Sequence, residues 1–287
     1  MTAIHSPGGW RKYRRRLAAA RAALLILLVL VLIVPVAWTV LASIDIKPEI
    51  ATWPPGWTSS PSTDNYREVM TSVPGFPRVL MTSISLSVVT TGLTIWAAFF
   101  AAYALARWRF RGRRIAVQSF LVLASMPAMA YVIPLSDITR RLALRDTFGG
   151  VALAAAATYV PLAIYILYGY LIRVPAALEE MARLEGASLP RTLWSIILPA
   201  AAPGLGATAV LVFVLNWNLF LVPTALTLNH VKTIPVALSD FYTYERELEW
   251  SNAAAALVVS LLPVTAIVVL AHRVLERLSL GPTHENP

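Results

Sequence analysis

Charged residues are missing from six long stretches of this chain and gather in the segments between them. No Asp, Glu, Lys, Arg or His occurs in residues 22–43, 79–106, 115–136, 147–172, 192–229 and 251–271. Each stretch holds the roughly 20 predominantly apolar residues that a membrane-spanning helix needs. The alternation of polar and apolar residues that is typical of a membrane β-barrel does not occur, so helices remain as the way to satisfy backbone polar groups in lipid. The pattern predicts an all-α membrane protein with six transmembrane helices.

The same pattern predicts where the spans begin and end. We expect a basic tail over residues 1–21, a six-helix domain over residues 22–276 and a second tail over residues 277–287. The spans are predicted at about 22–43, 79–106, 115–136, 147–172, 200–224 and 251–272. A basic tail before an apolar run is also typical of a cleaved secretory signal, but this run exceeds the roughly 7 to 15 residues of a signal's apolar core. We therefore expect the first helix to be retained.

Composition supports a membrane protein, and the distribution of charge predicts how the chain is oriented in the membrane. The chain has 287 residues, of which 57% are hydrophobic and only 14% charged, whereas soluble domains average about 25% charged residues. The net charge is +9, and two thirds of the Lys and Arg residues lie in the two tails and in residues 107–114 and 173–191. Because basic residues favour the cytoplasmic side, we expect a multi-pass membrane protein with both termini in the cytoplasm.

Residues 107–114 alternate arginine with Trp108, Phe110 and Gly112, a pattern that also occurs in nucleic-acid-binding patches. The preference of basic residues for the cytoplasmic side already accounts for it. We expect membrane lipid around the chain and no nucleic acid among its partners.

Several kinds of chemistry are disfavoured by what the sequence lacks. There is no cysteine, the four histidines are scattered, and no GxxxxGK[ST] phosphate loop occurs, so we expect no metal site, no catalytic residue and no cofactor in this chain. The apolar stretches also lack the ionisable groups that ion-coupled carriers and intramembrane hydrolases use. Three function classes remain open: a passive channel, a structural membrane protein and a permease driven by another subunit.

The longest cytoplasmic segment predicts a helical bracket at the membrane surface. Pro175 begins a short helix over residues 176–185, Glu179 and Glu180 lie near its N-terminal end, and Gly186 stops it. A second helical stretch follows Leu189 and leads into the next span.

This bracket resembles the EAA loop of binding-protein-dependent ABC importer permeases. The spacing of that loop is kept from its glutamate to its final proline, and Met181 replaces the usual first alanine. The matching residues are Glu180, Ala182, Gly186, Ile196, Leu198 and Pro199.

Flanking segments narrow the resemblance to the maltose-permease type of the carbohydrate uptake family. They are residues 43–49, 103–107, 216–218 and 232–235. The resemblance implies a six-helix permease of the type I importer fold whose loop, over residues 175–199, seats a coupling helix in a cleft of a cytoplasmic ATPase. It implies the following coupling residues: Glu180, Ala182, Gly186, Ala187 and Leu189.

The resemblance also implies the partners. They are a second permease subunit that completes a heterodimer, two copies of an ABC ATPase that bind ATP and Mg, and an extracytoplasmic solute-binding protein or lipoprotein. The implied cargo is a carbohydrate. The same machinery importing a phosphorylated polyol, a peptide or an amino acid is an alternative, and a membrane scaffold that docks an ATPase without transport is another.

Polar and aromatic groups in the spans are candidates for a solute path, because aromatic faces cover the C–H surfaces of sugars while amides bind their hydroxyls. Hydrogen bonding between helices and anchoring at the lipid interface are the alternative roles for these residues. The candidates are Tyr131, Tyr165, Asn216, Trp217 and Asn218.

Overall fold

The structure is a computed structural model that describes residues 7–46, 48–49, 56–57, 60–71, 75–227, 230–239 and 250–279. The chain divides into two compact units. The smaller comprises Met1–Val73 with Leu248–Val259, and the larger comprises Pro74–Glu247 with Ser260–Pro287. Helix α12 (Trp250–Ser279) contributes its first turns to the smaller unit and the rest to the larger.

The smaller unit is built on the long helix α1 (Pro7–Ser43), which begins well before the predicted span. It also contains α2 (Asp64–Thr71) and two strands of two residues each, β1 (Pro48–Glu49) and β2 (Gly56–Trp57). The Ser43 hydroxyl and the Tyr66 hydroxyl lie 2.6 Å apart and join α1 to α2. The apolar side chains of α1 are exposed from Leu17 to Leu41, and Ala42 near its end is buried. This exposure is expected of a helix surrounded by lipid or by another membrane subunit.

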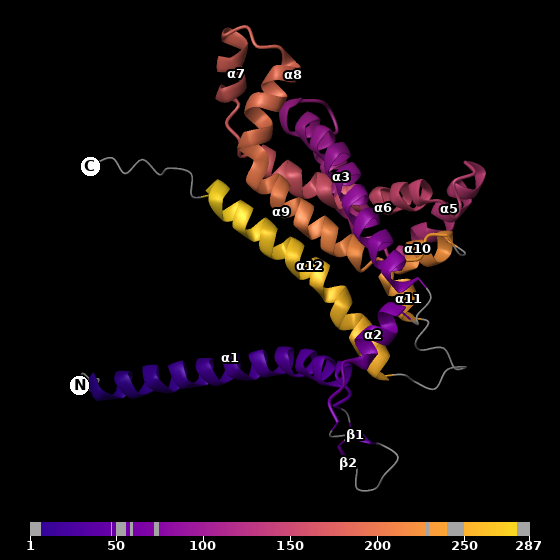
Figure 1. The fold of residues 1–287 in the computed structure, drawn as a ribbon. Helices are drawn as coiled ribbons and strands as arrows, with labels where there is room; N and C mark the ends of the chain where they lie inside the picture. Colours follow the sequence, from indigo (N-terminus) through magenta and orange to yellow (C-terminus); the bar gives the residue numbers. More distant parts are fainter. Residues whose placement is uncertain are drawn as a thin grey trace. The chain divides into compact units, whose positions relative to one another are not determined.

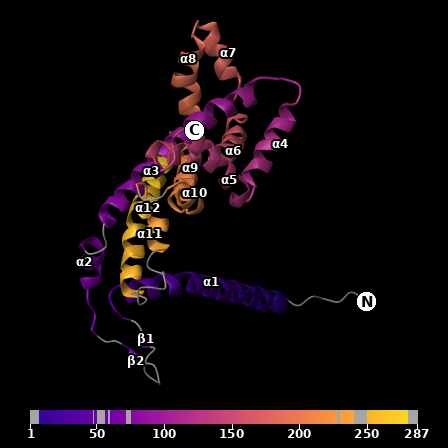
Figure 2. The ribbon, with the colours of Figure 1, turned by 90° about the vertical axis from the view of Figure 1, so that its right-hand side faces the viewer.

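The larger unit contains the remaining helices, shown in two views in Figures 1 and 2. Their bounds are α3 (Phe76–Arg107), α4 (Arg113–Ala124), α5 (Ala128–Arg141), α6 (Phe148–Leu171), α7 (Ala177–Leu184), α8 (Leu189–Thr192), η1 (Leu193–Ile197), α9 (Leu198–Trp217), α10 (Leu221–Leu226) and α11 (Ile234–Ser239).

The main core of this unit lies where α3, α6 and α9 pack together. Small buried residues bring the helices close, among them Ala98 and Ala102 of α3, Ala163 of α6 and Ala201 of α9. Close packing of small residues is how helices associate in lipid, where the hydrophobic effect between them is weak. A second core joins α5 and α10 to the first half of α6.

The third predicted span is bent rather than straight. Helices α4 and α5 meet at 94° across a break at residues 125–127. Pro127 ends this break and begins α5, and a proline cannot donate the hydrogen bond that would continue α4. The sequence predicted one span over residues 115–136, and the structure instead makes a broken one.

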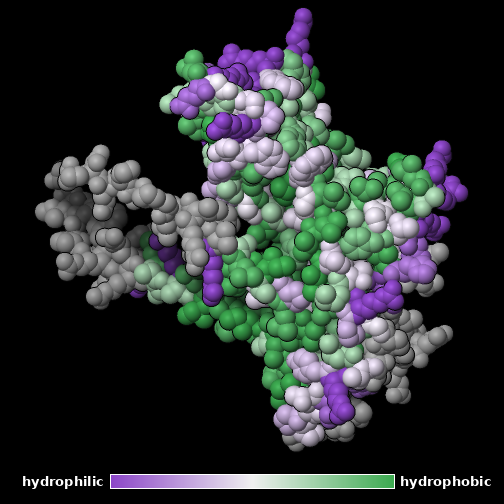
Figure 3. Space-filling view, turned by 45° about the horizontal axis from the view of Figure 1, so that its top comes forward, coloured by the Kyte–Doolittle hydropathy of each residue, from purple (hydrophilic) through white to green (hydrophobic). Residues whose placement is uncertain are grey.

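Among the described residues, five helices are long and apolar enough to cross a membrane, and the bent pair makes a sixth if it counts as one span. The all-α class is confirmed, with β1 and β2 as a minor addition. In the larger unit, Figure 3 shows apolar side chains over the middle and polar side chains at the end that carries α7 and α8.

Candidate functional site

The loop between α6 and α9 forms a helical hairpin at one end of the larger unit (Figure 1). Its first arm, α7, ends because Gly186 adopts a left-handed conformation with φ of 79°, which is costly for a residue with a Cβ. The Gly186 N–H donates to the Arg183 carbonyl at 3.0 Å, and the Ala187 N–H donates to the Ala182 carbonyl at 2.9 Å. These two bonds close a Schellman motif. Gly186 therefore ends the helix as the sequence predicts.

The second arm continues without a break into the membrane-spanning helix. Helix α8 passes into the π-helical turn η1 and then into α9, so residues 189–217 form one apolar helix of 29 residues. In η1 the Leu198 N–H donates to the Leu193 carbonyl five residues earlier. This wider turn lies directly before Pro199, whose ring would otherwise clash with the carbonyl of the preceding turn. The boundary predicted at Pro199 therefore does not separate two helices. The chain widens locally into the π-helical turn there and continues as one helix.

Glu179 anchors α7 to the membrane-spanning core. It is only 4% exposed, and its Oε2 accepts a hydrogen bond of 3.0 Å from the Tyr103 hydroxyl. Its Oε1 lies 2.5 Å from Nε of Arg107. A carboxylate is buried at this low exposure only when it is paired, and both of its partners come from the last turns of α3.

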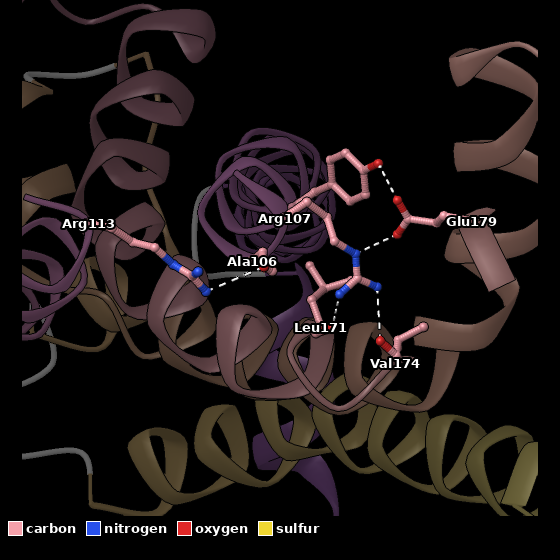
Figure 4. Close-up of polar contacts among 7 residues, drawn as sticks. Ala106, Arg107, Arg113, Leu171, Val174 and Glu179 are labelled. Atoms are coloured by element: carbon pink, nitrogen blue, oxygen red, sulfur yellow. Dashed lines mark hydrogen bonds and ion pairs between the residues drawn. The ribbon is translucent and has the colours of Figure 1, made fainter. Parts of the chain in front are cut away.

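The Arg107 guanidinium reaches a third segment as well (Figure 4). Nη1 donates to the Leu171 carbonyl at 3.1 Å and Nη2 donates to the Val174 carbonyl at 3.0 Å. The last carbonyls of a helix have no partner within it, and Arg107 supplies one where α6 ends. One partly buried side chain thus joins the C-terminal ends of α3 and α6 to α7.

The opposite face of α7 is exposed and mixes one carboxylate with apolar side chains. Glu180 points away from the buried face that carries Glu179 and Ala182. Met181 is 61% exposed and Leu184 is 88% exposed, and polar side chains surround them at this end of the larger unit (Figure 3). Large exposed apolar side chains in a polar surrounding are typical of a protein–protein contact.

The five predicted coupling residues differ in their surroundings. Glu180 and Leu189 are exposed and are available to a partner, whereas Ala182 is buried. Gly186 and Ala187 form the turn that fixes the angle between the two arms.

The comparison with known proteins identifies the family. The family described as "Binding-protein-dependent transport system inner membrane component" matches residues 94–279, which include α7, the turn at Gly186 and the continuous helix from α8 to α9. The chain belongs to this family. It is a multi-pass inner-membrane permease component, a transport subunit whose family leaves ATP hydrolysis to a separate partner.

Relatives of this permease carry sugar-transport names. The trehalose transport system permease protein SugB of Mycobacterium tuberculosis is 32% identical over 253 residues, which cover 87% of this chain and 91% of that protein. The trehalose/maltose transport system permease protein MalG of Thermococcus litoralis is 31% identical over 242 residues, covering 84% of this chain and 87% of that protein. The resemblance to the carbohydrate-uptake type is confirmed.

A solved structure shares the fold. A chain of a bacterial ABC transporter involved in the import of the acidic polysaccharide alginate superposes with a TM-score of 0.71 at 22% sequence identity, covering 95% of this chain and 99% of that one. At this identity the likeness concerns the fold alone. It agrees with the type I importer architecture that the EAA loop implies.

The permease's predicted solute-path residues are scattered. Tyr165 lines a cavity beside α4, and Tyr131 packs partly buried against the second core. Trp217 is buried and stacks on Phe213.

The two asparagines at the end of α9 differ in their surroundings. Asn216 is buried and donates from Nδ2 to the Val212 carbonyl of its own helix, while its Oδ1 has no hydrogen-bond partner among the described residues. Asn218 is exposed and donates to the Val214 carbonyl. Among the described residues, no group of three His, Asp or Glu side chains could hold a metal ion.

Sequence reasoning missed the role of Glu179, Arg107 and Tyr103. A signal was present, because Glu179 lies three residues before Ala182 and therefore on the same face of a helix. If Ala182 is buried, Glu179 on the same face is buried too, and a buried carboxylate requires a cation as its partner. Arg107 was explained by membrane orientation alone, and its position in the family-like segment 103–107 was the second signal.

Proposed function

We propose that this chain is the permease subunit of an importer that moves a carbohydrate into the cytoplasm, driven through the α7–α8 hairpin by a partner ATPase. One observation supports this above the others: α7 is fixed to the core by its buried face and presents Glu180, Met181 and Leu184 on its exposed face. A surface that only bound a partner would not need a buried ion pair beneath it. The relatives named for trehalose and maltose transport support a sugar or oligosaccharide as cargo.

The hairpin can transmit force because each arm is joined to a different part of the bundle. Arg107 ties α7 to the ends of α3 and α6. The arm α8 is one helix with α9. Movement of a bound ATPase would therefore be carried into three membrane-spanning helices, as alternating access requires.

The proposed coupling surface consists of exposed and positioning residues. Glu180 accepts charge-assisted hydrogen bonds from a basic group of the ATPase, and Leu189 adds apolar contact. Ala182, Gly186 and Ala187 hold the hairpin in shape. ATP and Mg are bound by the ATPase.

The assembly that we propose is a heterodimer with a second permease subunit, two copies of the ATPase and an extracytoplasmic solute-binding protein or lipoprotein. Both termini and the α7–α8 hairpin lie on the cytoplasmic side of a bacterial inner membrane, because the basic residues concentrate there. Single cysteines test this orientation directly, since the chain contains none. A cysteine at position 229 that reacts only from the cytoplasmic side contradicts it.

We also propose that the segment at the end of α9 contributes to the solute path or its gate, through Asn216, Trp217 or Asn218. The buried Asn216 Oδ1 supports this role, because a buried amide oxygen without a donor is destabilising and a sugar hydroxyl or the second subunit would supply one. Alanine at each position should alter uptake kinetics while assembly is kept. Unchanged uptake in all three variants contradicts the proposal.

Reconstitution of the complete importer in proteoliposomes tests the proposed function. Sugar-dependent ATP hydrolysis accompanied by sugar uptake is the expected result, after a ligand screen on the binding protein has identified the sugar. ATP hydrolysis without uptake of any ligand shows a scaffold. Uptake of a phosphorylated polyol, a peptide or an amino acid alone shows that the carbohydrate assignment is wrong.

A further inference from the structure

A cavity of about 810 Å³ lies between α4 and the second half of α6. Its polar lining includes three arginines, two of them from the first turn of α4, Arg113 and Arg114, and the third, Arg173, from just beyond the end of α6. Neither the coupling hairpin nor the proposed solute path needs these three cations together. Figure 2 shows α4 beside the core helices of this unit.

The cavity is positively charged without internal compensation. No Asp or Glu is among its lining residues. Within the described part of the chain, Arg113, Arg114 and Arg173 form no ion pair with a carboxylate. Like charges gathered in a partly enclosed site repel one another, so the cavity favours an anion.

Arg113 is held in place before any ligand arrives. Its Nη2 donates to the Ala106 carbonyl at 3.3 Å and to the Tyr168 hydroxyl at 3.2 Å, and its guanidinium lies 5.6 Å from the centre of the Tyr168 ring. Its Nε is buried and has no hydrogen-bond partner among the described residues. The Arg113 guanidinium is thus fixed at the charged end of the cavity.

Beyond the arginines the lining is mainly aliphatic and aromatic, with the amide of Gln118 as a further polar group. Val117 and Leu121 follow the arginines along α4, and Ile166 and Tyr165 face them from α6. The charged end and the apolar end therefore lie along the axis of the same helices. The charged end belongs to segments 107–114 and 173–191, which carry many of the basic residues proposed to lie in the cytoplasm. This order of charge followed by apolar surface matches a lipid that stands in the cytoplasmic leaflet.

We propose that this cavity binds an anionic phospholipid, with the phosphate at Arg113, Arg114 and Arg173 and the acyl chains along Val117 and Leu121. The arginine fork suits phosphate oxygens. The apolar wall favours a phospholipid over free phosphate, because free phosphate has no acyl chain to pack against it. The inference goes beyond the proposed transport function and rests only on its orientation, with residues 107–114 in the cytoplasm.

The experiment uses the assembled transporter in nanodiscs of phosphatidylcholine with a rising fraction of phosphatidylglycerol. Native mass spectrometry counts the phosphatidylglycerol molecules that stay bound. The double variant Arg114→Gln/Arg173→Gln should weaken retention about thirty-fold, because one basic side chain beside an anionic lipid changes affinity about five-fold. Both residues are exposed, so their replacement should leave the fold intact.

The matched control is Arg109→Gln/Arg111→Gln, which removes the same amount of charge from residues 107–114, the segment of Arg114, but not from the cavity. It should retain phosphatidylglycerol as the wild type does. Equal losses in the two double variants, or equal retention of phosphatidylcholine and phosphatidylglycerol, overturn the proposal.

A cysteine at position 114 separates the remaining outcomes. Cross-linking of this cysteine to the second permease subunit in most of the complex shows that the cavity is a subunit contact, which overturns the lipid site. Labelling from the extracytoplasmic side overturns the orientation and with it the site. Sugar-dependent ATP hydrolysis is measured separately in all variants, so a failed lipid site is distinguished from a failed transport function.

Discussion

The buried ion pair between Arg107 and Glu179 gives the sharpest prediction about the hairpin. Removing one partner of a buried pair typically destabilises a protein by about 3 to 5 kcal/mol, because the other charge is left without compensation. Arg107 keeps its bonds to the Leu171 and Val174 carbonyls, so we expect the lower end, about 3 kcal/mol, for Glu179→Ala. That corresponds to roughly a hundred-fold rise in the population with α7 detached.

The assay exploits the absence of native cysteine. A cysteine placed at Ala182, which is 4% exposed, reacts with a thiol reagent only when α7 opens. In membranes stripped of the ATPase, its labelling rate should rise roughly a hundred-fold with Glu179→Ala and about ten-fold with Glu179→Gln, which keeps an acceptor but loses the charge. The matched control is the neighbouring exposed Glu180→Ala, which should leave the rate unchanged.

A double-mutant cycle adds Arg107→Met to Glu179→Ala. The two single changes should be strongly non-additive, because the second removes a group that the first has already left unpaired. Equal labelling rates in Glu179→Ala and Glu180→Ala, together with additive effects in the cycle, refute the anchoring role of Glu179.

Two further predictions concern glycines, Gly186 in the α7–α8 hairpin and Gly204 in α9. Gly186→Val should weaken ATPase co-purification strongly and Gly186→Asn only slightly, since asparagine tolerates the left-handed conformation that valine resists; equal loss in both contradicts the turn geometry. Gly204→Val should lower the thermal stability of the purified permease, because even a Cβ there would meet the Tyr170 ring at 2.5 Å. Gly169→Val is its control, since a Cβ added there would meet no atom of another element within 4 Å, and similar losses in the two variants contradict the close packing of α6 on α9.

The spans and the hairpin were predictable because they depend on local composition. The absence of charge over twenty or more residues identifies a helix in lipid without any tertiary information. Gly186 likewise specifies its turn by itself, since its left-handed conformation is a property of one residue. The bounds of α3 and α6 accordingly lie within a few residues of the predicted ones.

The parts that escaped prediction depend on contacts distant in sequence or on the degree of a bend. The bond between Tyr103 and Glu179 joins residues 76 positions apart, and the helical spacing that marks Glu179 as buried does not specify which partner it meets. Pro127 indicates a break but not an angle of 94°. Pro199 indicates a boundary, whereas the π-helical turn before it lets α8 and α9 form one helix.

The central claim is that Glu180 couples this permease to its ATPase. The most direct test is sugar-stimulated ATP hydrolysis by the complete importer in proteoliposomes, with ATPase co-purification measured on the same preparations. Glu180→Ala should reduce both, because it removes charge-assisted hydrogen bonds worth roughly 1.5 to 3 kcal/mol. Glu185→Ala, an exposed carboxylate in the same loop, should behave as the wild type. Wild-type docking and stimulated hydrolysis in Glu180→Ala would contradict the account.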